Sequence, residues 1–190
     1  MFTGIITHLG KIKNKSKNSL NIKTEKELIV KLSIGTSIAV DGICLTVVRF
    51  DNDFFWIEFM PETEDKTSIK YLKVGDLVNL ELPVTPTSFL SGHITQGHID
   101  GVSKLINMKK KGNSYLLRFS MPANLSKYVT PKGSIAVNGV SLTIIETGKV
   151  FFTVGIIPHT WTNTMFHTIK IGDFFNIEVD ILAKYIKRLL

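Results

Sequence analysis

The twelve residues SIAVDGICLTVV, Ser37 to Val48, occur a second time in this chain as SIAVNGVSLTII, Ser134 to Ile145. Each copy consists of a short apolar run, an Asp-Gly or Asn-Gly pair and a second apolar run. Because these pairs tolerate the positive φ angles of a tight turn, each copy predicts a β-hairpin. The difference that matters most for chemistry is at one position, which is Cys44 in the first copy and Ser141 in the second.

The repeat extends beyond the hairpins. An offset of 97 residues relates Phe54-Phe55 to Phe151-Phe152, Pro61 and Thr63 to Pro158 and Thr160, and KVGDLVNLE (73–81) to KIGDFFNIE (170–178), and it also pairs Gly4 with Gly101. An internal repeat outweighs local signals when a fold is assigned. Two copies are too few for a solenoid, so the sequence predicts two similar domains, residues 1–86 and 87–180.

Within each copy the elements are short and mostly strand-like. In the first copy the expected strands are Met1 to Ile6, Gly10 to Lys13, Leu20 to Lys23, the two hairpin strands, Phe54 to Phe59 and Leu77 to Leu82. Pro61 to Lys70 is the one helical candidate, with proline at its start and acidic residues in its first turn. Many short strands with closely spaced turn signals predict an all-β fold, a small antiparallel barrel in each domain.

Two segments lie outside the repeat. Pro83 to Ser91 contains two prolines and several polar residues, which predicts a linker. Ile181 to Leu190 places its apolar side chains on one helical face and its basic side chains on the other, which predicts an amphipathic helix. A single short helix at a chain end needs a surface to pack on. Either its own barrel or a sister subunit would provide that surface.

Composition narrows the class of protein. The chain has 190 residues, 44% of them hydrophobic, and its mean hydropathy is +0.17, which indicates a packed globule. No apolar run reaches the roughly 18 residues of a membrane span, and the N-terminus MFTGIITHLG lacks a charged leader region. One cysteine cannot form an internal disulfide. We therefore expect a reduced, cytoplasmic protein without a membrane partner.

The formal charge of +7 raises nucleic acid as a partner. The lysines are concentrated in Lys11 to Lys17 and in Lys109 to Lys111. A small-barrel nucleic-acid binder interleaves exposed aromatic residues with its basic ones, and these two stretches contain none. We expect no nucleic-acid binding.

Two histidines follow the linker in the sequence SGHITQGHID. His93 and His98 are separated by four residues, so on a strand they would point to opposite sides and on a helix they would leave the shared face. No further cluster of ligands accompanies them, and we expect no metal. A histidine in such a place is commonly a packed residue, but the neighbouring glycines allow a ligand to approach the backbone closely.

The return strands of the hairpins carry the candidate polar groups. Free cysteine is often a small buried hydrophobe, which is one interpretation of Cys44. The other interpretation rests on Ser141, because a serine in the core would bury a hydroxyl group that needs a partner. Thr46 and Thr143 lie two residues further on, and hence on the same strand face. A strand face that carries Cys or Ser beside Thr, with glycines nearby, is more typical of the floor of a ligand site than of a core.

Taken together, these motifs resemble the riboflavin synthase family of the α-chain type. The resemblance rests on the opening MFTGII, the GICLT and GVSLT hairpins, the GHxxxGHIDG block, the segments MPETEDKT and IPHTWTNT, and the two KxGDxxN(L/I)E closures. It covers essentially the whole chain. The chain departs from the family pattern at Ser91, Gln96 and Trp161, which concerns the details of the substrate pocket.

The resemblance implies two six-stranded antiparallel Greek-key barrels and a C-terminal helix used in a homotrimer. It implies the dismutation of two 6,7-dimethyl-8-ribityllumazine molecules to riboflavin and 5-amino-6-(ribitylamino)uracil, without cofactor or metal. One lumazine would bind to each barrel, and the N-terminal barrel of one subunit would face the C-terminal barrel of a neighbour. The resemblance also raises an association with lumazine synthase. The alternative is a non-catalytic lumazine- or flavin-binding relative.

The resemblance also implies the site residues. It places Cys44, Ser141, His93, His98 and Asp180 in or beside the chemistry. As a hypothesis for that chemistry, His98 is the leading general base, and Cys44, Ser141 or a water molecule is the nucleophile. It assigns to the N-terminal pocket Gly4, Ile5, Ile6, Cys44, Leu45, Thr46, Glu58, Phe59, Met60, Pro61, Glu62 and Thr63, and it adds Phe2 and Ser37 as further substrate-binding residues. It assigns to the C-terminal pocket Gly97, His98, Ile99, Lys132, Ser141, Leu142, Thr143, Ile156, Ile157, Pro158, His159, Thr160 and Trp161.

Overall fold

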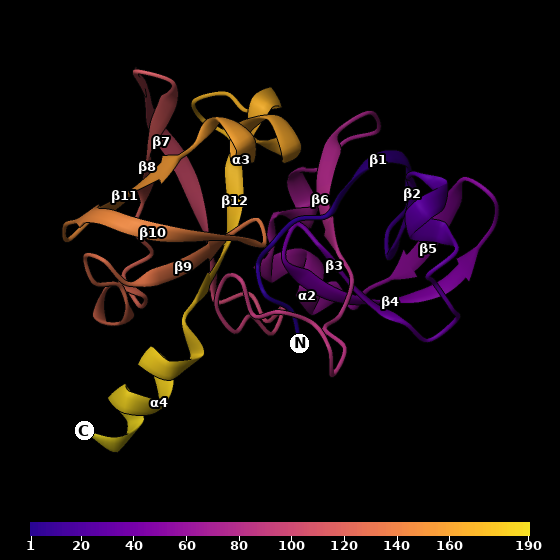
Figure 1. Cartoon of the computed structure of the whole chain (residues 1–190), viewed down its shortest axis with the longest axis horizontal. Helices are drawn as coiled ribbons and strands as arrows, with labels where there is room; N and C mark the ends of the chain where they lie inside the picture. Colours follow the sequence, from indigo (N-terminus) through magenta and orange to yellow (C-terminus); the bar gives the residue numbers. More distant parts are fainter.

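Two closed antiparallel barrels of six strands each stand side by side in the computed structural model, which describes residues 1–190 (Figure 1). The first barrel contains β1 (His8–Lys15), β2 (Ser19–Lys23), β3 (Ser37–Val40), β4 (Ile43–Phe50), β5 (Phe54–Glu58) and β6 (Leu77–Glu81). The second contains β7 (Gly101–Lys111), β8 (Ser114–Ser120), β9 (Ser134–Val137), β10 (Val140–Thr147), β11 (Phe151–Ile156) and β12 (Phe174–Val179). The order β1-β2-β5-β4-β3-β6 recurs in the second barrel and is a Greek-key order. The all-β prediction is confirmed.

Both predicted hairpins form. The turn between β3 and β4 has φ angles of 46° at Asp41 and 79° at Gly42, and the turn between β9 and β10 has 44° at Asn138 and 76° at Gly139. These are the angles for which Asp-Gly and Asn-Gly pairs are selected.

The return strand β4 shows why the candidate polar residues lie outside the barrel. Ile43, Leu45 and Val47 are buried in the core of the first barrel. Because side chains alternate along a strand, Cys44 and Thr46 point to the outer surface, where both have exposed area. Ser141 and Thr143 have the same arrangement on β10. A ligand that contacts Cys44, Thr46, Ser141 or Thr143 would therefore bind outside the barrels.

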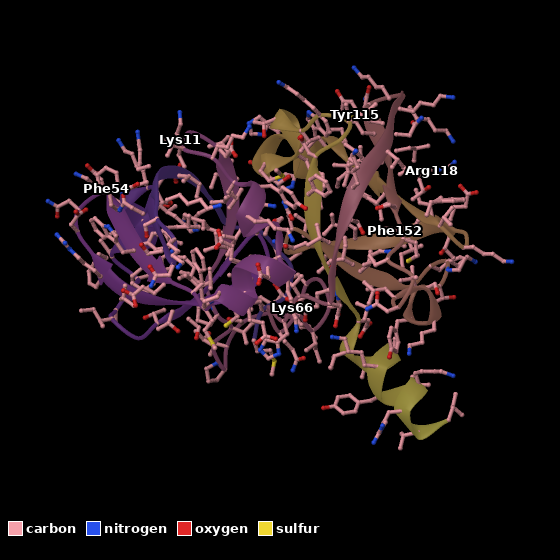
Figure 2. All side chains as sticks on the ribbon, turned by 180° about the vertical axis from the view of Figure 1, so that it is seen from behind. Lys11, Phe54, Lys66, Tyr115, Arg118 and Phe152 are labelled. Atoms are coloured by element: carbon pink, nitrogen blue, oxygen red, sulfur yellow. The ribbon has the colours of Figure 1, made fainter.

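The aromatic core of the second barrel includes Phe152, which Figure 2 shows inside the barrel wall.

The predicted helix Pro61 to Lys70 is wrong in its extent. The helix α2 (Pro61–Lys66) ends before Thr67, and a separate 3₁₀ turn, η1 (Ser68–Tyr71), follows. Thr67 is extended, with φ −124° and ψ 174°, and its hydroxyl oxygen accepts a hydrogen bond from the Ile69 N–H. The side chain of Thr67 thus caps the second turn and breaks the first.

The other helical elements are short. They are α1 (Lys26–Ile29), η2 (Ser126–Tyr128), α3 (Pro158–Asn163), η3 (Met165–Thr168) and α4 (Ile181–Leu189). The expectation of a single helical segment in each copy is wrong, because α1 and η2 fill the same connection in the two barrels. The predicted C-terminal helix is confirmed as α4.

The repeat offset changes ahead of the hairpins, which corrects the pairing of Gly4 with Gly101. His8 pairs with Leu80 in the first barrel, and Gly101 pairs with Ile177 in the second. Since Ile177 corresponds to Leu80, His8 corresponds to Gly101 and Gly4 to Gly97. The β7–β8 hairpin is longer than the β1–β2 hairpin, and this insertion cannot be located from an ungapped comparison.

The segment ahead of each barrel crosses to the other barrel. The Ser141 N–H on the second barrel donates a hydrogen bond to the Gly4 carbonyl at 2.8 Å, and the Cys44 N–H on the first barrel donates to the Gly97 carbonyl at 2.9 Å. The two crossing segments meet in an isolated bridge between Phe2 and Thr95. The expected strand at Met1 to Ile6 is therefore wrong as a barrel strand, because its bridge partner Thr95 and the Ser141 N–H that bonds to Gly4 belong to the other half of the molecule.

Helix α4 extends away from both barrels (Figure 1). Its apolar residues Leu182, Tyr185, Ile186 and Leu189 are between 59% and 87% exposed. Its own barrel therefore does not cover its apolar face. None of the helices is long and apolar enough to cross a membrane.

The crossing contact at Gly97 leads to a stability prediction. A Cβ atom on Gly97 would lie 2.5 Å from the Cys44 Cβ and 2.6 Å from its backbone nitrogen, and φ is +80°. We expect Gly97→Ala to lower the free energy of unfolding by about 2–4 kcal/mol through steric overlap and backbone strain. Gly35→Ala is the matched control, because φ is +89° there but nothing lies within 4 Å, so strain alone should cost about 1–2 kcal/mol. Equal losses in urea denaturation would contradict the crossing contact.

Candidate functional site

The first site lies on the outer face of β4 and β5. Cys44 and Thr46 project from β4, and Thr46 pairs with Glu58 on β5. Helix α2 follows directly after β5 and brings Thr63 to the rim. The crossing segment that contains Gly97 closes the site at the Cys44 end, and the next residue, His98, is exposed there. The first site thus takes residues from both halves of the chain.

The second site occupies the equivalent face of β10 and β11. Ser141 and Thr143 project from β10, and Gly155 stands on β11 where β5 carries Glu58. Along one edge, the Trp161 ring of α3 stacks on Tyr115 of β8 with centroids 3.7 Å apart and planes 17° apart. The second site therefore has a flat aromatic edge and no carboxylate at the position of Glu58.

Ser141 has a histidine partner. The distance from its Oγ to the His93 Nδ1 is 2.6 Å. The backbone N–H of His93 donates to the Thr3 carbonyl at 3.1 Å. Gly92 makes room for this approach, because a Cβ atom there would lie 2.1 Å from the Thr3 carbonyl oxygen. A hydroxyl group held against a histidine nitrogen is an arrangement for proton transfer.

The environment of His93 keeps its ring neutral. Burial lowers the pKa of His93 below its ordinary value, and the negative charge of Asp180 opposes that shift in part. Asp180 is also the N-cap of α4, where its Oδ1 accepts a hydrogen bond from the Leu182 N–H at 2.9 Å. A neutral histidine can accept the Ser141 proton, so the shift suits a general base near neutral pH.

Two buried glutamates hold the crossing segments. Glu81 accepts hydrogen bonds from the Thr3 N–H at 2.7 Å and the Gly4 N–H at 3.0 Å. Glu178 accepts from the Gln96 N–H at 2.6 Å and the Gly97 N–H at 2.9 Å. Burial raises the pKa of both carboxyl groups, and these N–H donors oppose the rise. Each glutamate lies at or next to the end of the last strand of its own barrel and positions the segment that completes the other barrel's site.

These contacts correct the expected grouping of the pockets. Gly4 to Ile6 lie on the second barrel, against Ser141, and the Ile6 side chain packs on that barrel's core. Gly97 to Ile99 lie on the first barrel, against Cys44, and Ile99 packs on the first core. The physical reason is the exchange of leading segments between the barrels.

Several expected ligand residues face the cores. The side chains with 8% exposure or less are Phe2, Leu45, Phe59, Leu142 and Ile156. A contact of these residues with a ligand on the outer face would therefore be made by their backbone atoms. Phe2 is itself part of the first crossing segment, where it is buried and forms the bridge to Thr95.

Other expected residues are accessible around the sites. Ser37 pairs with Thr46 at the edge of the first site. Lys132, in a turn with φ of 67°, lies next to β10 through its N–H bond to the Ile144 carbonyl. The remaining accessible residues are Ile5, Met60, Pro61, Glu62, Ile157, Pro158, His159 and Thr160. No group of three or more His, Cys, Asp or Glu side chains is arranged to hold a metal ion.

Sequence reasoning missed four residues of the sites: Glu81, Glu178, Thr3 and Tyr115. The two glutamates end the duplicated closures VNLE and FNIE. The repetition of a glutamate at the end of an apolar strand was therefore a signal in the sequence for these two residues. A carboxylate that is buried at the equivalent position of both copies needs hydrogen-bond donors, so the same kind of donor is expected in each copy. Nothing in the sequence distinguishes Tyr115 from other strand aromatics.

The geometry defines a class of protein: two barrels that each present polar side chains on one outer strand face. The model of the lumazine binding domain matches this chain twice, at residues 3–83 and 96–180. The riboflavin synthase of Photobacterium phosphoreum is 40% identical over the whole of this chain and 89% of its own length. That of Bacillus subtilis (strain 168) is 40% identical over the whole of this chain and 90% of its own length.

Solved structures show the same fold. LumP complexed with riboflavin superposes with a TM-score of 0.88 at 28% identity, covering 94% of this chain and 99% of LumP. LumP complexed with 6,7-dimethyl-8-(1'-D-ribityl) lumazine gives 0.84 at 26% identity over the same shares of both chains. This chain belongs to the lumazine-binding, riboflavin synthase family.

The charge of Asp180 leads to a prediction for His93. Asp180→Ser keeps an N-cap side chain for α4 but removes the negative charge that raises the pKa of His93. We expect the His93 titration midpoint, followed by NMR of the imidazole signals, to fall further below its ordinary value. The helical circular dichroism should be retained. An unchanged midpoint would show that Asp180 acts only as a cap.

Proposed function

We propose that this chain catalyses the riboflavin synthase reaction. Two molecules of 6,7-dimethyl-8-ribityllumazine exchange a four-carbon unit and give riboflavin and 5-amino-6-(ribitylamino)uracil. The full-length similarity to riboflavin synthases supports the reaction. The observation that carries it is the pair of equivalent outer-face sites, since a reaction between two identical substrates needs two similar pockets with different polar groups.

The polar groups differ in a way that suits a donor and an acceptor. The second site holds Ser141 against His93 at 2.6 Å, and we assign His93, through the Ser141 hydroxyl, to removal of a proton from the 7-methyl group of one lumazine. This assignment replaces His98 as the leading base, because His93 is buried beside a hydroxyl group whereas His98 is exposed. The first site holds Cys44 with His98 on the adjacent crossing segment, and Cys44 or a water molecule would add to the second lumazine.

Positioning would supply a large part of the rate. Holding two reactants in a reactive geometry contributes on the order of 7–11 kcal/mol. Both sites lie on the outer faces of the barrels. We therefore propose that the two lumazines meet where the first barrel of one subunit faces the second barrel of another. The assembly would be a cytoplasmic homotrimer, with lumazine synthase as the candidate partner protein.

The alternative is a binding protein without turnover. It rests on the likeness to LumP, whose complexes contain riboflavin and a ribityl lumazine. In this chain both sites have a nucleophile or hydroxyl with an adjacent threonine, and a histidine belongs to each. A binding protein requires none of these groups in duplicate, so we favour the enzyme.

One assay separates the two functions. Purified protein is mixed with 6,7-dimethyl-8-ribityllumazine, and riboflavin is followed by absorbance and chromatography. We expect steady riboflavin formation with two lumazines consumed for each product. Lumazine binding without product would identify a binding protein instead.

Variants test the catalytic roles. We expect Ser141→Ala and His93→Gln each to lower kcat by about 10²–10⁴-fold, the usual effect of losing a positioned acid–base group. Lumazine fluorescence titration should show that binding to the first site persists. Ser126→Ala, on a turn at the surface of the second barrel, is the matched control and should keep full activity. A loss confined to KM would contradict the proton-transfer role.

Substitutions in helix α4 test the proposed homotrimer. The double variant Ile186→Asp, Leu189→Asp places two charges on its exposed apolar face, and we expect sedimentation velocity to shift from trimer to monomer. Lys187→Ala, on the opposite face, is the control and should remain trimeric. A double variant that stays trimeric would remove α4 from the subunit contact.

A further inference from the structure

Helix α4 is joined to the second barrel by an ion pair close to one of the two buried glutamates. The helix follows β12 directly (Figure 1), and β12 contains Glu178, whose carboxylate holds the crossing segment of the first site. The Lys184 Nζ lies 2.7 Å from the Asp100 Oδ1, and 25% and 21% of the two side chains are exposed. The other oxygen of Asp100, Oδ2, accepts a hydrogen bond from the Val179 N–H at 2.9 Å. The ion pair therefore ties the helix to the residue that follows Glu178.

The equivalent glutamates of the two barrels are held by different sets of donors. Glu81 accepts three hydrogen bonds, from the N–H and the hydroxyl group of Thr3 and from the next N–H along the chain. Glu178 accepts two, from the N–H groups of Gln96 and Gly97. Gln96 occupies the position of Thr3 and has no hydroxyl group. The second glutamate therefore lacks the side-chain donor that the first one has.

A positive charge stands near the glutamate that lacks this donor. Glu81 and Glu178 are both buried, at 4% and 2% exposure, and a buried carboxylate needs donors or a nearby cation to stay charged. Burial raises the pKa of Glu178, the two N–H groups and the charge of Lys184 oppose the rise, and the charge of Asp100 adds to it. Burial also raises the pKa of Glu81, but there hydrogen bonds alone oppose the rise.

The other titratable groups around Glu178 lie on the crossing segment and at the start of the helix. The crossing segment carries His93 and His98, and α4 begins at its N-cap Asp180. On the neighbouring strand β9, the partner of Glu178 is Ala136, which has no charge. Lys184 is therefore the one lysine or arginine in this group.

We propose that Lys184 is a positioning residue for the first site. Its ammonium group supplies a positive charge in place of the donor that Gln96 lacks. The charged Glu178 can then hold Gly97 against Cys44, whose N–H donates to the Gly97 carbonyl at 2.9 Å. This role rests on the proposed function of the first site. It gives α4 a task within its own chain that is separate from the subunit contact.

The direction of the pH dependence follows from the charge. An ionised carboxyl group accepts hydrogen bonds on both oxygens, whereas protonation turns one oxygen into a donor. Glu178 therefore loosens its hold on the crossing segment as the pH falls through its pKa. Removal of Lys184 raises that pKa further, so the segment is released at a higher pH.

The direct test is an NMR titration of the Gly97 amide signal against pH, which requires no turnover. We expect its midpoint to move to higher pH in Lys184→Met, which keeps the apolar stem, and to stay in place in Lys184→Arg, which keeps the charge. Lys187→Met is the matched control, because it removes the same charge from an exposed position on the same helix. An unchanged midpoint in Lys184→Met, or an equal shift in Lys187→Met, would overturn the proposal.

Two double variants separate this role from simple anchoring of the helix. Asp100→Asn keeps an oxygen acceptor but removes the charge that raises the pKa of Glu178. Added to Lys184→Met, it should therefore move the midpoint back to lower pH. Gln96→Thr, which copies Thr3, should do the same by restoring the hydroxyl donor. If Lys184 only anchored α4, neither change would restore the midpoint, because the ion pair is already lost. A midpoint that stays high in both double variants would contradict the role of charge.

Activity provides the second readout. We expect Lys184→Met to lower kcat/KM near pH 6, with a smaller loss near pH 8.5, since Glu178 is more fully ionised at the higher pH. An equal loss at both pH values would count against the proposal. If the unmodified chain forms no riboflavin, the proposed function fails, and the Gly97 titration still decides the role of Lys184.

Discussion

The exchange of leading segments between the barrels is the constraint on which the sites depend. The Cys44 and Ser141 N–H groups donate to the carbonyls of Gly97 and Gly4, which belong to the opposite halves of the chain. The buried carboxylates of Glu81 and Glu178 hold those segments by their N–H groups. Each barrel thereby provides the strand face of its own site, whereas its leading segment completes the site on the other barrel.

The same exchange explains how a duplicated chain obtains two unequal sites. The barrels share strand order and hairpin turns, so their outer faces have the same arrangement of strands. The crossing segments differ: the second site receives Gly4 to Ile6 together with His93, and the first receives Gly97 to Ile99 with His98. Substitutions such as Glu58 against Gly155 add to the difference. Between the barrels, Asp41 and Ser68 of the first copy stand where the second copy has Asn138 and Met165, so the two copies also diverged away from the substrate sites.

Much of the fold was predictable because its signals are local. Asp-Gly and Asn-Gly turns, alternating strands and the duplicated closures act over a few residues, so the hairpins, β5, β6 and α4 were placed correctly. The helix at Pro61 was predicted too long, because its end depends on one side-chain hydrogen bond of Thr67. The Gly4–Gly101 pairing failed because the β7–β8 hairpin carries extra residues that no residue in the sequence marks.

The sequence by itself determined that the chain is a duplicated all-β protein whose polar candidates Cys44, Thr46, Ser141 and Thr143 share one strand face, since strand periodicity and turn chemistry are properties of neighbouring residues. Only the tertiary structure decided which segment completes which site, that His93 rather than His98 contacts Ser141, and that Asp41 lies buried between the barrels. These outcomes depend on hydrogen bonds between residues roughly 50 to 140 positions apart, and such contacts are chosen by the packing of the whole molecule rather than by any local pattern.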